Sequence, residues 1–191
     1  RNPTGMPDAE ASAQAEEYLQ KCIENQDSAG GVVSCKVHGM PAGIGEPVFD
    51  KLDACLGQAV MSIGAVKAFA VGDGCEVSKK NGSTNNDAFC NVNGQISKKT
   101  NHAGGILGGI SDGSDIILRA YFKPTPSIYQ KQQTVNQAGE EIEIQIKGRH
   151  DPIVVSRAVV VVEAMTAVTI LDELLRNMTS RLDGIKKFYH K

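Results

Sequence analysis

Three short segments of the chain carry residue types that bind or transform small anionic molecules. The stretch 101–111 holds two glycine pairs, Gly104-Gly105 and Gly108-Gly109, which leave a length of backbone without side chains. A flat or phosphorylated ligand could lie directly on such backbone. The stretch has neither the Gly-Lys-Ser/Thr of a P-loop nor a GxGxxG fingerprint after a strand. Tight packing of backbone on backbone would explain the same glycines, so both interpretations stay open.

The second segment, 123–127, reads Lys-Pro-Thr-Pro-Ser and follows an expected strand directly. Its lysine and two hydroxyls can donate hydrogen bonds to a phosphate. Its two prolines fix φ, so that little ordering is needed when a ligand binds. An ordinary surface turn is the alternative interpretation.

The third segment, 148–152, reads Gly-Arg-His-Asp-Pro. Arg149 can hold a phosphate or carboxylate through two parallel hydrogen bonds, and Asp151 can accept or orient a proton. In the alternative, Asp151 is the N-cap of a helix whose first turn contains Pro152.

Hydrophobic periodicity predicts the elements that must position these segments. The predicted helices cover 7–26, 47–62 and 157–177, and the predicted strands cover 32–37, 66–71, 114–122 and 141–147. The pair Asn93-Gly94 predicts a two-residue hairpin inside the polar stretch 78–104, which we expect to be an exposed loop or flap. One α+β domain covering 1–191 is the resulting prediction.

Two helices and one strand have apolar positions that we expect to be buried. In the helix over 47–62 these positions are Phe49, Leu52, Leu56, Ala59 and Val60, and in the helix over 157–177 they are Ala164, Val168, Leu171, Leu175 and Met178. The strand over 141–147 alternates charged or polar residues with isoleucine, which predicts one buried face.

The net charge and the cysteine content exclude several classes of partner and site. The formal net charge of the 191 residues is -2, without the basic excess that binding to nucleic acid or to an anionic membrane surface usually requires. No run of about 18 apolar residues occurs, so we expect no membrane partner. The five cysteines form no CxxC pair, which predicts neither a metal site nor a disulfide framework and favours the reducing cytoplasm.

Several motifs in a fixed order give the chain a resemblance to the C-terminal half of the chorismate synthase family. The matching motifs lie at 7–10, 26–33, 45–54, 61–67, 101–111, 123–125, 148–152 and 163–165. The resemblance implies the C-terminal portion of one chorismate synthase domain, with the N-terminal half absent. It also implies a β-α-β sandwich of antiparallel sheets around a helical layer, assembled as a homotetramer in the full-length enzyme.

The chemistry implied by this resemblance belongs to a carbon–oxygen lyase. Family members convert 5-enolpyruvylshikimate 3-phosphate to chorismate by a 1,4-trans elimination of phosphate, a step of aromatic amino acid biosynthesis in the shikimate pathway. The reaction requires reduced FMN, which lends electron density to the substrate and recovers it. Whether NADPH or an outside donor reduces the flavin is left open by the sequence.

Site residues follow from the matching motifs. The expected FMN contacts are Gly64, Ala65, Gly108, Lys123, Pro124, Thr125, Pro126, Ser127 and Arg149. Arg149 would also bind the substrate, and Asp151 would be the catalytic residue that assists proton transfer near the flavin N5. The family's two catalytic histidines lie in N-terminal motifs absent here, so His102 and His150 are not assigned to those roles. The leading interpretation is therefore part of an FMN-dependent lyase, with this chain inactive when it is alone. The alternative is that this part of the enzyme has no catalytic role and binds FMN or phosphate or serves assembly.

Overall fold

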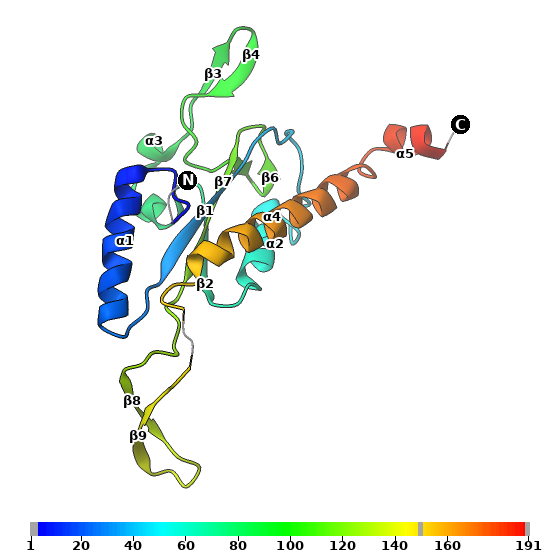
Figure 1. The fold of residues 1–191 in the computed structure, drawn as a ribbon. Coiled ribbons are helices and arrows are strands. Elements are labelled where there is room, and N and C mark those ends of the chain that lie inside the picture. Colours follow the sequence, from blue (N-terminus) through cyan, green and yellow to red (C-terminus); the bar gives the residue numbers. More distant parts are fainter. Residues whose placement is uncertain (1–3, 149–150, 190–191) are drawn as a thin grey trace.

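The computed structural model describes residues 4–148 and 151–189, and Figure 1 shows its elements. The helices are α1 (Ala9–Glu24), α2 (Leu52–Met61), α3 (Gly82–Asn85), α4 (Val155–Asn177) and α5 (Leu182–Tyr189), with a 3-10 helix η1 at Gly74–Lys79. The strands are β1 (Gly31–Val37), β2 (Val66–Val71), β3 (Phe89–Val92), β4 (Gln95–Lys98), β5 (Ile106–Leu107), β6 (Ile110–Ser111), β7 (Ile116–Phe122), β8 (Lys131–Val135) and β9 (Glu141–Gln145).

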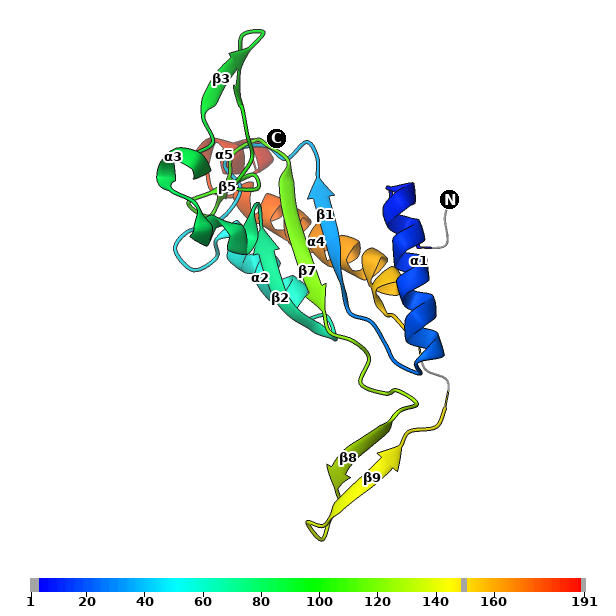
Figure 2. The same ribbon diagram turned by 90° about the vertical axis from the view of Figure 1, so that its left-hand side faces the viewer.

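The centre of the fold is an antiparallel sheet with the strand order β1-β7-β2. Helices α2 and α4 pack against each other and cover one face of this sheet, while α1 runs beside β1 (Figures 1 and 2). Large apolar side chains of both helices and of the central strand are fully buried where they meet: Leu52, Leu56 and Val60 of α2, Ile116 and Leu118 of β7, and Val162 of α4. The predicted α+β class is confirmed. The strands predicted over 32–37, 66–71 and 114–122 and the helix predicted over 157–177 are also present.

The first helix is capped as its sequence suggests. Asp8 takes an extended conformation, and its carboxylate accepts a hydrogen bond from the backbone N–H of Ala11 at 2.9 Å. This satisfies one of the N–H groups that a helix leaves without an internal partner, and the negative charge suits the N-terminal end of the helix dipole. The helix ends before Gln26, whose φ of 56° turns the chain sharply toward β1.

The second predicted helix is shorter than the sequence indicates. It begins at Leu52, whose backbone N–H donates to the carbonyl of Gly109 at 2.8 Å, and the residues before it form a separate turn closed by a bridge between Glu46 and Asp50. The prediction that Phe49 is buried is therefore wrong, because its side chain lies outside the helix and is 90% exposed.

The long helix α4 buries a different face from the one predicted. The positions that face the sheet are Ala158, Val162, Thr166, Ile170 and Glu173. The predicted set Ala164, Val168, Leu171, Leu175 and Met178 is exposed along the opposite side. Apolar residues occur around the whole helix, so periodicity alone could not say which stripe would meet the sheet. The structure thus presents an exposed apolar stripe on α4.

Two hairpins project from the body (Figures 1 and 2). The predicted turn at Asn93-Gly94 joins β3 to β4, with positive φ at both residues, and Ile96 near its tip is 86% exposed. The strand β9 pairs with β8, a polar strand that the sequence analysis missed. Because this hairpin stands away from the core, β9 has no fully buried position, and its predicted buried face is wrong. No helix in the described part of the chain is long and apolar enough to cross a membrane.

Candidate functional site

The Lys-Pro-Thr-Pro-Ser segment emerges from the end of β7. In the sheet Phe122 lies opposite Val66, which places the segment next to the start of β2. The backbone N–H of Lys123 donates to the carbonyl of Ala65 at 2.9 Å, and Ala65 has a φ of 70°. A non-glycine residue in this conformation is held there by its surroundings, and such strain concentrates at functional sites. Two stretches of the predicted FMN site, 64–65 and 123–127, therefore meet at one end of the sheet.

Ser127 and Asp151 meet at a small hollow in the same region. Its volume is about 80 Å³, and its lining residues are Ile23, Gln26, Asp27, Ser28, Ser127, Ile128, Tyr129, Asp151 and Pro152. The hydroxyl of Thr125 is buried without a hydrogen-bond partner among the described residues. A buried hydroxyl without a partner costs free energy, so its presence beside a lysine and a second hydroxyl fits an anion-binding loop.

Asp151 is not a helix cap. The helix α4 begins at Val155, its N-cap is Val154 without a side-chain bond, and Asp151 instead forms an ion pair with Arg157. The capping interpretation is therefore wrong. The predicted FMN and substrate contact Arg149, and His150 beside it, lie outside the described residues.

The four paired glycines of the 101–111 stretch do not all serve the same purpose: some allow close backbone packing, and one leaves space for a ligand. A Cβ built on Gly104, Gly105 or Gly109 would lie 2.3 to 2.5 Å from a neighbouring atom, so these three glycines serve close packing. Gly108 has no atom within 4 Å of such a Cβ, and its φ of 60° belongs to the turn between β5 and β6. Of the four glycines, Gly108 is the one whose surroundings leave room for a ligand.

The structure does not bring Gly108 to the loop at 123–127. Gly109 accepts from the first residue of α2, whereas Gly64 and Ala65 follow the end of that helix. A helix of 10 residues is about 15 Å long, so the predicted contacts occupy both ends of α2. Gly64 itself is exposed, with nothing within 4 Å of the Cβ position.

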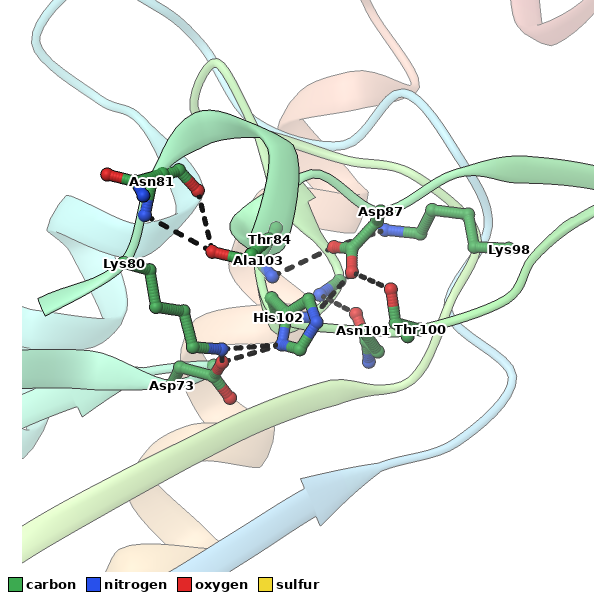
Figure 3. Close-up of polar contacts among 12 residues, drawn as sticks. Asp73, Lys80, Asn81, Thr84, Asp87, Lys98, Thr100, Asn101, His102 and Ala103 are labelled. Carbon is green, nitrogen blue, oxygen red and sulfur yellow. Dashed lines mark hydrogen bonds and ion pairs between the residues drawn. The ribbon is translucent and has the colours of Figure 1, made fainter. Parts of the chain in front are cut away.

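A buried polar network holds the loop that leads to Gly108 (Figure 3). The carboxylate of Asp87 accepts from the Thr100 hydroxyl at 2.7 Å and from the backbone N–H groups of His102 and Ala103 at 2.7 and 2.9 Å. Burial alone would raise the pKa of Asp87, but these hydrogen bonds, together with the nearby charge of Lys98, lower it to about 2. The ionised carboxylate is therefore the form that the loop binds.

Lys98 stands between two carboxylates in the same network. Its ammonium lies 2.6 Å from Asp112 and 3.6 Å from Asp87, and the three side chains are 4%, 8% and 3% exposed. Buried charges persist only when they are paired and hydrogen-bonded, as they are here. The cluster joins the base of the β3–β4 hairpin to both ends of the glycine stretch.

A second polar group lies beside it, at the end of β2. The Nδ1 atom of His102 is 2.6 Å from a carboxylate oxygen of Asp73 and 3.0 Å from the ammonium of Lys80 (Figure 3). A hydrogen bond from Lys80, aided by one from His102, lowers the pKa of Asp73. This arrangement orients the imidazole and links the turn after β2 to the 101–111 stretch.

Sequence reasoning missed these two groups, because it treated 78–104 as an exposed loop. The hairpin tip is exposed as expected, but the side chains of Asp87 and Lys98 at its base are buried. The Asn93-Gly94 turn carried a usable signal: a two-residue hairpin centred there places residues 87 and 100 near each other at its base. No motif pointed to Asp73 or Lys80, which reach His102 only through the fold.

The comparisons with known proteins give the chain its family. The family model for chorismate synthase matches residues 1–175. The chain belongs to the chorismate synthase family. The chorismate synthase of Lachnoclostridium phytofermentans is 62% identical over 191 residues, which are 100% of this chain and 52% of that protein. The chorismate synthase of Agathobacter rectalis is 58% identical over 190 residues, which are 100% of this chain and 52% of that protein.

A solved structure agrees with the family assignment. A crystal structure of chorismate synthase matches with a TM-score of 0.74 and 27% sequence identity, covering 95% of this chain and 48% of that one. The α+β architecture of chorismate synthase is thus shown for this chain as well. The chain spans about half the length of the curated chorismate synthases that it matches.

Proposed function

We propose that this chain is the C-terminal portion of a single chorismate synthase domain and carries part of its FMN site. The whole protein would be a cytoplasmic homotetramer that eliminates phosphate from 5-enolpyruvylshikimate 3-phosphate to give chorismate. The observation that carries the proposal is that Ser127, at the end of the 123–127 loop, and Asp151 line one small hollow, while the Thr125 hydroxyl of the same loop is buried without a partner among the described residues. The reaction is proposed from the family, and this geometry supports an FMN site near the 123–127 loop.

The 123–127 loop, whose last residue Ser127 lines this hollow, has the chemistry that FMN needs. Lys123 is exposed, and with the hydroxyls of Thr125 and Ser127 it would hold the phosphate through charge-assisted hydrogen bonds. Pro124 and Pro126 restrict the loop, which lowers the ordering cost of binding. Gly64 and Ala65 would let the cofactor approach the backbone, with Arg149 as a further contact, whereas Gly108 lies at the other end of α2. Reduced FMN, with NADPH or another reductant as its electron source, would lend electron density to the substrate as phosphate departs.

Asp151 would assist removal of the ring proton. Its carboxylate lies at the edge of the hollow, and the ion pair with Arg157 holds it in one orientation. A proton acceptor must lie within hydrogen-bond reach of the proton that it takes, so a fixed orientation favours this role. Arg149 would bind the anionic substrate on the same segment of the chain.

A titration of this chain with FMN, followed by flavin fluorescence, tests the proposal. We expect micromolar binding that Lys123→Ala weakens at least tenfold, because the variant removes a cation from a phosphate contact. Lys99→Ala is the matched control, since Lys99 is an exposed lysine on the hairpin base and should leave the affinity unchanged. Absence of binding would show that this chain alone does not form the FMN site, and equal weakening by both variants would show that the site does not depend on the 123–127 loop.

The exposed stripe on α4 favours a second candidate, a non-catalytic assembly fragment. Val168, Leu171 and Leu175 are more than half exposed on one side of this helix. Contiguous apolar surface of this kind marks an interaction site. In sedimentation velocity we expect the chain to self-associate, and Leu171→Glu to shift it toward the monomer. Turnover of substrate by the chain with reduced FMN would exclude the non-catalytic candidate.

A further inference from the structure

A short segment between α1 and β1 touches both loops of the proposed site. We call residues 27–29 the strap. The Ser28 hydroxyl donates to the carbonyl of Thr125 at 2.7 Å, and the backbone N–H of Ala29 donates to the carbonyl of Pro152 at 2.8 Å. Two consecutive residues of the strap therefore hold the 123–127 loop and the residue that follows Asp151.

The strap is itself fixed at both ends. On its N-terminal side, the backbone N–H of Asp27 donates to the carbonyl of Cys22 at 2.8 Å, directly after the left-handed residue Gln26. On its C-terminal side, a Cβ on Gly30 would lie 2.6 Å from the carbonyl oxygen of Phe122 and 3.2 Å from the ring of Pro124. The backbone of the strap is thus pressed against the start of the loop, where no larger residue fits.

The two strap contacts differ in what they connect. Ala29, which is 2% exposed, also forms an isolated parallel bridge with Ile153, so its contact is made by backbone groups alone. The bond from Ser28 is made by a side chain, and it reaches a loop that the described residues otherwise hold through the backbone bond at Lys123 and a bond from the Gln132 amide to the carbonyl of Pro126 at 3.1 Å. Removing this hydroxyl frees the middle of the loop without disturbing the sheet.

We propose that Ser28 is a positioning residue for the FMN-dependent elimination. Through its bond to Thr125 it fixes the position of the phosphate-binding hydroxyls of the 123–127 loop relative to Asp151. Both Ser28 and Asp27 line the hollow that Ser127 and Asp151 share, so the strap also forms one of its walls. This inference rests on the proposed function, since it assumes that FMN binds at the loop.

The test compares Ser28→Ala with two other variants. Ser28→Thr keeps the hydroxyl and should restore wild-type behaviour. Ser78→Ala is the matched control, because Ser78 also donates to a backbone carbonyl at 2.8 Å, that of Cys75, but in η1. Each protein is titrated with FMN, unfolded in urea, and examined by hydrogen exchange of the amides in 124–130.

We expect Ser28→Ala to weaken FMN binding about fivefold to tenfold and to speed exchange in 124–130, with the urea midpoint close to that of Ser78→Ala. Equal FMN affinity of Ser28→Ala and the wild type would overturn the positioning role, as would a failure of Ser28→Thr to restore the affinity. If the wild-type chain binds no FMN, the proposed function fails instead. Exchange in 124–130 then decides whether Ser28 holds the loop, and unchanged exchange in Ser28→Ala would refute that too.

Discussion

Replacing Asp87 by asparagine should destabilise the chain in a way that depends on pH. The variant keeps the size of the side chain but removes the charge that three donors and Lys98 bind. The usual pKa of 3.8 and the value of about 2 in the folded chain differ by an amount equivalent to about 2 kcal/mol of stability at pH 7. The side chain is 3% exposed, so solvent screens little of this contribution.

The direction of the pH dependence follows from the lowered pKa. Because the folded state binds the proton of Asp87 less tightly than the unfolded state, the contribution is complete above about pH 4 and is lost as the pH falls through 2. Urea unfolding at pH 7 should show Asp87→Asn less stable than the wild type by about 2 kcal/mol, and the difference should fall to about half at pH 3.

A control and a direct titration complete this test. Asp183→Asn removes an exposed carboxylate that pairs with Arg181 on the surface, and it should change the stability by less than about 0.5 kcal/mol. The carboxyl carbon of Asp87, followed by NMR, should titrate well below pH 3. A difference between wild type and Asp87→Asn that is under 0.5 kcal/mol, or that is the same at pH 7 and pH 3, would refute the role assigned to this carboxylate.

Two further predictions concern packing. Gly72→Ala should destabilise the chain by on the order of 3 kcal/mol, because its φ is 57° and a Cβ would lie 2.0 Å from the carbonyl oxygen of His102. Gly139→Ala, at a φ of 82° with open space around it, should cost about 1 kcal/mol; equal urea midpoints for the two would contradict the close approach. Val162→Ala should cost about 2 kcal/mol and Val160→Ala under 0.5 kcal/mol, since the first side chain is fully buried and the second is 63% exposed. Thermal unfolding measures this pair, and a reversed order would mean that α4 packs through its other face.

Local sequence signals were sufficient where a single stretch of chain decides its own structure. The helix at Ala9–Glu24 has its cap, its alanines and its charge pairs within one stretch, and the Asn93-Gly94 hairpin needs only two residues with positive φ. The strand at Gly31–Val37 is a short valine-rich run that starts in a glycine pair, and the strand at Val66–Val71 is followed directly by the turn pair Asp73-Gly74 and its neighbour Gly72. In each case the decisive interactions lie within a few residues along the chain, so the pattern could be read directly.

The predictions failed where the partner of a segment lies elsewhere in the sequence. Helix α4 is apolar on more than one side, and the position of the sheet decides that Val162 rather than Leu171 is buried. Phe49 is excluded from the core because Leu52 starts the helix by pairing with Gly109, 57 residues later. The strand β8 was missed for another reason: it is too polar to show an apolar alternation, although its partner β9 follows it in a local hairpin.

The sequence by itself determined the family, the α+β class and the residue types of the proposed site, because ordered motifs and periodicity are properties of the chain alone. Only the tertiary structure decided which of those residues meet. It brought Ala65 to Lys123 and Ser127 to Asp151, and it left Gly108 at the other end of α2. It also buried the charges around Lys98 and laid the strap across two loops. The residues in these contacts lie from 11 to 123 positions apart in the sequence, and they hydrogen-bond or are buried together because the fold brings them close in space.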